Sequence, residues 1–141
     1  MHAYLLYFIG ITIASVLSVS AFAMDVVAIT DKNHPINHIP AHMRVIRLDA
    51  PETILGEVSA GLPADHERAS LIAKERLNDS LHRQLRDALQ DVADAWMLDV
   101  QKIPAVVVDR RYVVYGEVDV VKALDIIKQY REQNREQEVR P

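Results

Sequence analysis

Three histidines spaced by four residues are the first side chains in this sequence that could do chemistry. They are His34, His38 and His42, and on a single helix they would face the same side. Imidazole nitrogens at that spacing can ligate a metal ion such as Zn²⁺. Pro40 would interrupt such a helix, and a closed structural site needs four ligands. A polar surface loop is therefore the favoured interpretation, and we expect neither a bound metal nor another cofactor.

A basic and aromatic triplet offers a second kind of chemistry. Arg110, Arg111 and Tyr112 follow a short apolar run. The two guanidinium groups could bind an acidic partner, and the tyrosine ring could stack on a ligand. A solvated turn between two strands is the alternative interpretation, because exposed ion pairs contribute little free energy.

Nothing in the sequence predicts an enzyme. It contains no recognisable Ser-His-Asp constellation, phosphate-binding loop or paired-carboxylate site. The 141 residues include no cysteine, which excludes disulfides, thiolate catalysis and Cys-based metal sites. The formal net charge of -4 gives no basic footprint for nucleic acid or an anionic membrane surface. We therefore expect no catalytic residues and no nucleic-acid partner.

The first 23 residues are expected to be a signal peptide. They contain no Asp, Glu, Lys or Arg, and they end in the small-x-small pattern of Ala21 and Ala23. Cleavage would follow Ala23; the alternative is an uncleaved anchor, since about 20 apolar residues can span a bilayer. In both cases the rest of the chain is exported, in a bacterium to the periplasm, and only this segment touches the membrane. A single domain over 24–130 and a polar tail over 131–141 are expected to follow.

Short apolar runs alternate with helical patterns along this domain. Strands are expected at 25–29, 44–48, 105–108 and 112–115, with 109–111 as the turn of a hairpin between the last two. Helices are expected after residues 49–50, after Asp65 and after Asp119, with Gly61 ending the first. Residues 78–80 would kink or split the long middle helix. Trp96 and Tyr130 fall on the apolar stripes of the second and third helical patterns, which predicts that both are buried.

Residues 95–109 resemble a passage of the thioredoxin-like fold, in which a helix runs into a loop ending Ile-Pro before a buried strand. The resemblance implies a three-layer α/β sandwich with a mixed sheet of about four strands, and it implies that Pro104 is cis. Asn33 and His34 stand near the place where the redox branch of that fold carries Cys-x-x-Cys, so dithiol exchange is impossible. The short segment between the first two strands speaks against a crossover helix there and against parallel pairing of those strands.

A closer resemblance covers three stretches, 48–51, 59–65 and 102–116. They are similar to a family of exported proteins encoded by integrating conjugative elements of proteobacteria. The resemblance implies a non-enzymatic component of mating-pair formation, whose partners are proteins of the type IV secretion apparatus. The alternative is a periplasmic chaperone, or a module without redox activity that binds peptides or metal.

The loop before the third strand is the sharpest candidate for a binding site. In the thioredoxin-like fold, the residue before the cis-proline can pair with an extended peptide. We expect Ile103, with Asn33 and His34 opposite, to form a peptide-docking groove. The alternative is that Pro104 only shapes the turn into the strand.

Overall fold

The computed structural model of the chain describes residues 24–41 and 43–138. The expected signal peptide, 1–23, and His42 lie outside these residues. The described elements are, in chain order, β1 (Val26–Thr30), β2 (Arg44–Arg47), α1 (Ala50–Ser59), α2 (His66–Arg76), α3 (Asp79–Met97), β3 (Ala105–Val108), β4 (Tyr112–Tyr115) and α4 (Val120–Glu138).

The strands form one mixed sheet in the order β2-β1-β3-β4. β1 is parallel to β2 and antiparallel to β3, and β3 and β4 form the predicted hairpin. The predicted α/β fold with a mixed sheet of about four strands is confirmed. The doubt about parallel pairing of β1 and β2 was misplaced, although the connection between them contains no helix. This connection runs past the start of α4, where Asn37 N donates to Val118 O (2.8 Å) and Val120 N to Asn37 O (3.1 Å).

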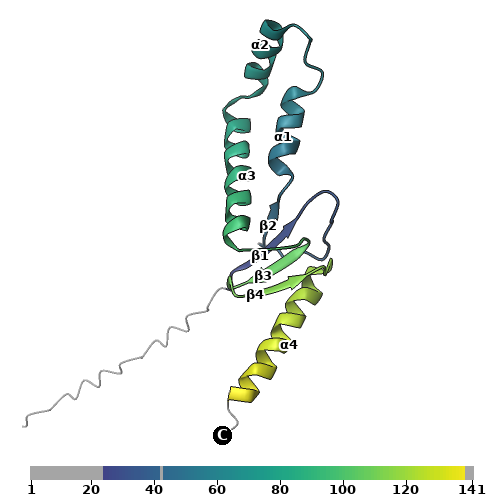
Figure 1. The fold of residues 1–141 in the computed structure, drawn as a ribbon, viewed down its shortest axis with the longest axis vertical. Coiled ribbons are helices and arrows are strands. Elements are labelled where there is room, and N and C mark those ends of the chain that lie inside the picture. Colours follow the sequence, from purple (N-terminus) through teal and green to yellow (C-terminus); the bar gives the residue numbers. More distant parts are fainter. Residues whose placement is uncertain (1–23, 42, 139–141) are drawn as a thin grey trace, which may run out of the picture.

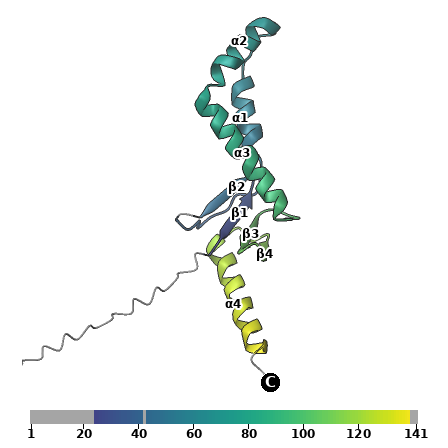
Figure 2. The same ribbon diagram turned by 90° about the vertical axis from the view of Figure 1, so that its left-hand side faces the viewer.

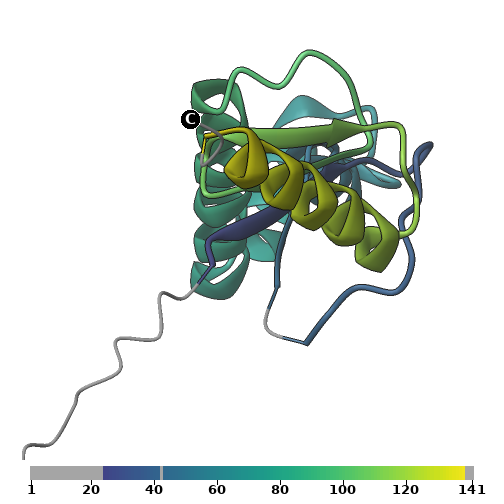
Figure 3. The ribbon, with the colours of Figure 1, turned by 90° about the horizontal axis from the view of Figure 1, so that it is seen from below.

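Alternate residues of β1 and β3 point to opposite faces of the sheet and form two apolar clusters. The first lies on the α3 side and consists of Val27, Ile29, Ile46, Ala95 and Val107. The second lies on the α4 side and consists of Ala28, Val106, Val120 and Ala123. The sheet is therefore the middle of three layers, with α4 crossing one face (Figures 1 and 3).

Three helices extend well beyond the sheet as an arm. α1 and α3 run side by side away from the strands, and α2 lies at the far end (Figures 1 and 2). α1 and α2 bury no residue, and in α3 only Ala88 and Ala95 are buried. None of the helices among the described residues combines the length and apolarity needed to cross a bilayer.

Side-chain caps mark the starts of α2 and α3. Asp65 Oδ1 accepts from Arg68 N (2.8 Å) at the start of α2, and Asn78 Oδ1 accepts from Leu81 N (3.0 Å) at the start of α3. The cap at Asn78 splits the long helical pattern into α2 and α3. Gly61 follows α1 with φ +62°, as expected of a residue that ends a helix in the left-handed region.

Two residues predicted to be buried are exposed. Trp96 is 80% exposed and Tyr130 is 54% exposed. α3 contacts the sheet through Ala95. Trp96, the next residue, therefore lies at the edge of this contact and stays exposed. α4 is longer than the sheet is wide, so its second half runs past the strands (Figure 1). The expected boundary at residue 131 consequently falls inside a helix, because α4 continues to Glu138.

Candidate functional site

The Ile103–Pro104 bond lies where α3 returns to the sheet. The bond is cis, as the resemblance to the thioredoxin-like fold implied. Pro104 is buried and its carbonyl accepts from Gly116 N (2.8 Å), which ties the entry of β3 to the exit of β4. Ile103 is half-buried and packs against the cluster on the α3 side.

Beside Ile103 lies an apolar pocket of about 300 Å³, which we call the Trp96 pocket. Its walls come from β1, the residue after β2, α3 and the loop between α3 and β3. The lining residues are Ile29, Leu48, Val92, Ala95, Trp96, Val100 and Ile103.

The local sequence explains how α3 builds this pocket. The small side chain of Ala95 allows the helix to lie close to the sheet, which places Val92 and Trp96 at the opening. The helix then ends in a tight return, where Asp99 N donates to Trp96 O (3.1 Å) and Asp99 adopts φ +52°. Val100 and Ile103 come back onto the sheet from this return.

The Trp96 pocket suits hydrophobic recognition. None of its lining residues has a titratable side chain, so the lining offers no acid, base or metal ligand. Its volume is at the lower end of the range for ligand sites, about 300–1,000 Å³. That space fits one or two apolar side chains of a partner protein.

The structure does not bring Asn33 and His34 into this pocket. Both lie in a turn after β1, where Asp31 Oδ1 accepts from the backbone N–H of each residue (2.9 Å and 2.9 Å). His34 Nδ1 also lies 2.7 Å from Asp31 Oδ1, and this bond holds the pKa of Asp31 below its ordinary value. α3, instead of these two residues, supplies the wall opposite Ile103.

The histidines considered as metal ligands are engaged separately. His38 Nδ1 lies 2.8 Å from Asp119 Oδ2, whereas His34 pairs with Asp31. The bond from His38 lowers the pKa of Asp119. Over 24–41 and 43–138, no group of three His, Cys, Asp or Glu side chains is placed to hold a metal ion.

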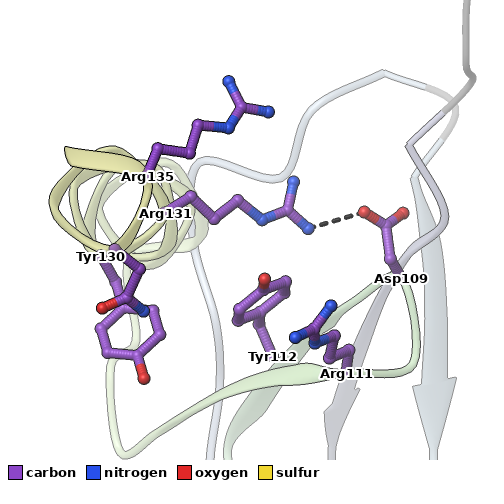
Figure 4. A pocket seen from close by; sticks show the side chains of 7 residues that line it. Asp109, Arg111, Tyr112, Tyr130, Arg131 and Arg135 are labelled. Atoms are coloured by element: carbon purple, nitrogen blue, oxygen red, sulfur yellow. Dashed lines mark hydrogen bonds and ion pairs between the residues drawn. The ribbon is translucent and has the colours of Figure 1, made fainter. Parts of the chain in front are cut away.

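The basic triplet of the hairpin leads to a second pocket, on the α4 side of the sheet. We call it the Arg131 pocket; it has a volume of about 780 Å³ (Figure 4). Its lining residues are Asp109, Arg111, Tyr112, Tyr130, Arg131, Asn134 and Arg135. Arg110 does not line it and lies exposed in the hairpin turn. Asp109 and Arg110 have φ +51° and +53°, the signature of a type I′ turn.

The sequence interpretation missed most residues of both pockets. Trp96 was predicted to be buried because helical spacing cannot distinguish an apolar stripe that another element covers from one that stays exposed. Arg131 and Arg135 stand four residues apart, a spacing that places both on one helix face. That signal was present, but residues 131–141 were interpreted as a polar tail.

Comparison with known proteins gives a family match. Residues 23–133 match the family model described as "Protein of unknown function (DUF1525)". The matched range contains all four strands, the arm and α4 as far as residue 133. Comparisons with curated proteins and with solved structures gave no match.

Proposed function

The chain belongs to the DUF1525 family of proteins of unknown function, and from there we propose that it is a non-enzymatic docking protein of a conjugative DNA-transfer apparatus. It is exported to the periplasm, is encoded by an integrating conjugative element, and assists mating-pair formation. Its partners are protein components of the type IV secretion machinery, which it contacts through the Trp96 pocket.

The exposed tryptophan at an apolar pocket is the observation that carries this proposal. Trp96 is 80% exposed and lines a pocket made otherwise of aliphatic side chains. Tryptophan is enriched among the residues that dominate binding energy at protein interfaces. A partner that inserts an apolar side chain beside Ile103 would remove both groups from water.

Features of sequence and fold support the rest of the proposal. The stretches 48–51, 59–65 and 102–116 carry the resemblance to proteins of conjugative elements. The strand order, the cis Ile103–Pro104 bond and the helices on both faces support a thioredoxin-like assignment. The absence of cysteine from the chain excludes dithiol exchange, which is consistent with a binding role for that scaffold.

Transfer frequency from donor cells tests the role of the pocket. We expect Trp96→Ala in the full-length chain to weaken partner binding by about thirtyfold, the loss typical of an interface hot spot, and thereby to lower the number of transconjugants. Met97→Ala is the matched control, because Met97 is the next residue of α3, is 65% exposed and does not line the pocket. Equal frequencies for the two variants at equal protein levels would rule out docking through Trp96.

Crosslinking identifies what the pocket binds. A photo-crosslinking residue at position 103 should capture one secretion component encoded by the same element, and Trp96→Ala should abolish that product. Capture of many unrelated unfolded proteins would instead indicate a periplasmic chaperone.

A further inference from the structure

The Arg131 pocket concentrates positive charge on an otherwise acidic protein. Its titratable cations are Arg111, Arg131 and Arg135, and Asp109 is its only acidic residue, so its formal charge is +2. The whole chain carries a formal net charge of -4. The three guanidinium groups come from the hairpin residue just before β4 and from two successive turns of α4 (Figure 4).

Asp109 neutralises only Arg131 of this cluster, because both of its carboxylate oxygens are already engaged. Oδ1 accepts from Asp25 N (3.0 Å) and Oδ2 accepts from Arg131 Nη2 (2.6 Å). Within the described residues, neither Arg111 nor Arg135 forms an ion pair. Two guanidinium groups at the pocket are thus left to bind an anion.

Arg131 is held in place before any ligand binds. Its guanidinium carbon lies 4.4 Å from the centre of the Tyr112 ring, and its side chain is 26% exposed. Its Nε is buried and has no hydrogen-bond partner in the part of the chain described. Arg131 therefore holds a fixed positive charge at the centre of the pocket, while its Nη2 stays paired with Asp109.

Two tyrosines add aromatic surface beside the cations. The rings of Tyr112 and Tyr130 meet edge to face, with centroids 6.1 Å apart, and Arg111 lies 5.4 Å from the Tyr112 ring. Tyr130 is 54% exposed at the opening. Rings of this kind contact the backbone and side chains of a peptide while their hydroxyl groups stay in water.

We propose that the Arg131 pocket binds an acidic peptide segment of a partner protein, with Arg111 and Arg135 gripping its carboxylates and Tyr130 packing against its backbone. Carboxylates match the planar fork of a guanidinium, which binds them through two parallel hydrogen bonds. The volume of about 780 Å³ exceeds what a single inorganic anion fills and favours a peptide. This proposal does not depend on the docking role of the Trp96 pocket, which lies on the other side of the sheet.

Fluorescence anisotropy with the full-length chain tests the proposal. The probe is a short fluorescein-labelled oligo-glutamate peptide, and an oligo-lysine peptide of equal length is the charge control. We expect the double variant Arg111→Gln/Arg135→Gln to weaken oligo-glutamate binding by about tenfold or more, because charge-assisted hydrogen bonds are lost. Both side chains are exposed, so the fold should persist.

Two further variants give the test its controls. Lys128→Gln removes an exposed cation of α4 that does not line the pocket, and it should leave affinity within about twofold of the unmodified chain. Tyr130→Ala should weaken peptide binding but leave the binding of inorganic phosphate unchanged. Equal losses in the Lys128 and double-arginine variants would overturn the proposal, because they would indicate unspecific charge attraction. Phosphate that displaces the peptide, together with no effect of Tyr130→Ala, would also overturn it in favour of a simple anion site.

Discussion

Two side chains of the β3–β4 hairpin contact one arginine of α4. Arg131 pairs with Asp109 and lies over the ring of Tyr112, and Asp109 also accepts from the backbone of Asp25. These contacts join the start of β1, the hairpin turn and the middle of α4. The Asp109–Arg131 pair therefore fixes the position of the helix that supplies most of the Arg131 pocket.

This pair makes stability depend on pH in the acidic range. The bond from Arg131 lowers the pKa of Asp109. A carboxyl group with a lowered pKa in the folded state stabilises the fold above its unfolded value of about 3.9, and it loses this effect as pH falls through the folded value. We expect Asp109→Asn to lower the melting temperature near neutral pH, and we expect the difference from the unmodified chain to shrink below about pH 4.

Thermal melts across this pH range provide the check. Asp31, Asp94, Glu117 and Asp119 also have lowered pKa values, so the unmodified chain loses stability in acid for several reasons. The difference between the two proteins isolates Asp109. A difference that stays constant down to acidic pH would show that the Asp109–Arg131 pair does not stabilise the fold.

The turn itself holds a residue in an unfavourable backbone conformation. Arg110 has φ +53°, a region that favours glycine, and its side chain is exposed. We expect Arg110→Gly to raise the free energy of unfolding by about 1 kcal/mol, because glycine adopts that conformation without a Cβ clash. Urea denaturation measures the change. Arg110→Ala is the control, since it removes the charge near Asp94 but keeps the Cβ; an equal gain in both would contradict the backbone explanation.

At the scale of elements, the arm is the least buried part of the molecule. α1 and α2 have no buried residue, and short helices are marginal in water without tertiary packing. Arg76 at the end of α2 donates to Val58 O (2.9 Å) and Ala60 O (2.6 Å) at the end of α1. One side chain thereby satisfies backbone carbonyls of one helix and anchors the next.

Removing this anchor should loosen the tip of the arm alone. We expect Arg76→Ala to raise amide hydrogen exchange in α2 by about three- to tenfold, while exchange in the sheet stays unchanged, because such regions open independently. Hydrogen exchange followed by mass spectrometry resolves the two regions. Arg83→Ala on α3 replaces an exposed arginine that makes no such hydrogen bonds within the described residues, and it should change hydrogen exchange in neither α2 nor the sheet. Faster exchange in the sheet of the Arg76 variant would show that the arm and the sheet open together.

At the scale of the whole molecule, one sheet joins two apolar clusters. Neighbouring residues of β3 serve different sides, since Val106 belongs to the cluster against α4 and Val107 to the cluster against α3. Both apolar clusters are built on the same four short strands. A core substitution on one face of the sheet should therefore weaken protection against amide hydrogen exchange on both faces.

Val106→Ala tests this coupling. We expect it to lower the free energy of unfolding by about 2 kcal/mol, from lost apolar burial and the cavity left behind. Hydrogen exchange should then rise in all four strands and in the half of α3 against the sheet, whereas α2 should keep its rate. Val118→Ala, at a residue that is 44% exposed, should leave exchange as it is. A rise confined to α4 and β3 would show that the two faces unfold separately.

The sequence by itself determined which elements form. Short apolar, β-branched runs marked the strands, Asp65, Gly61 and Asp119 marked helix boundaries, and residues 78–80 marked a break in the long helical pattern, because these signals act within a few residues of the chain. The absence of cysteine from the sequence excludes dithiol exchange by the residues of this chain.

Only the tertiary structure decided which apolar stripes are covered and which distant residues meet. Trp96 and Tyr130 occupy stripe positions, yet both are exposed. Trp96 lies at the edge of the contact between α3 and the sheet, next to the buried Ala95, and Tyr130 lies in the part of α4 that runs past the strands. The Trp96 pocket unites β1, α3 and the loop at Ile103, and the Arg131 pocket unites the hairpin with α4. Burial and such long-range contacts depend on how elements pack, and periodicity within one segment carries no information about the width of the surface it meets.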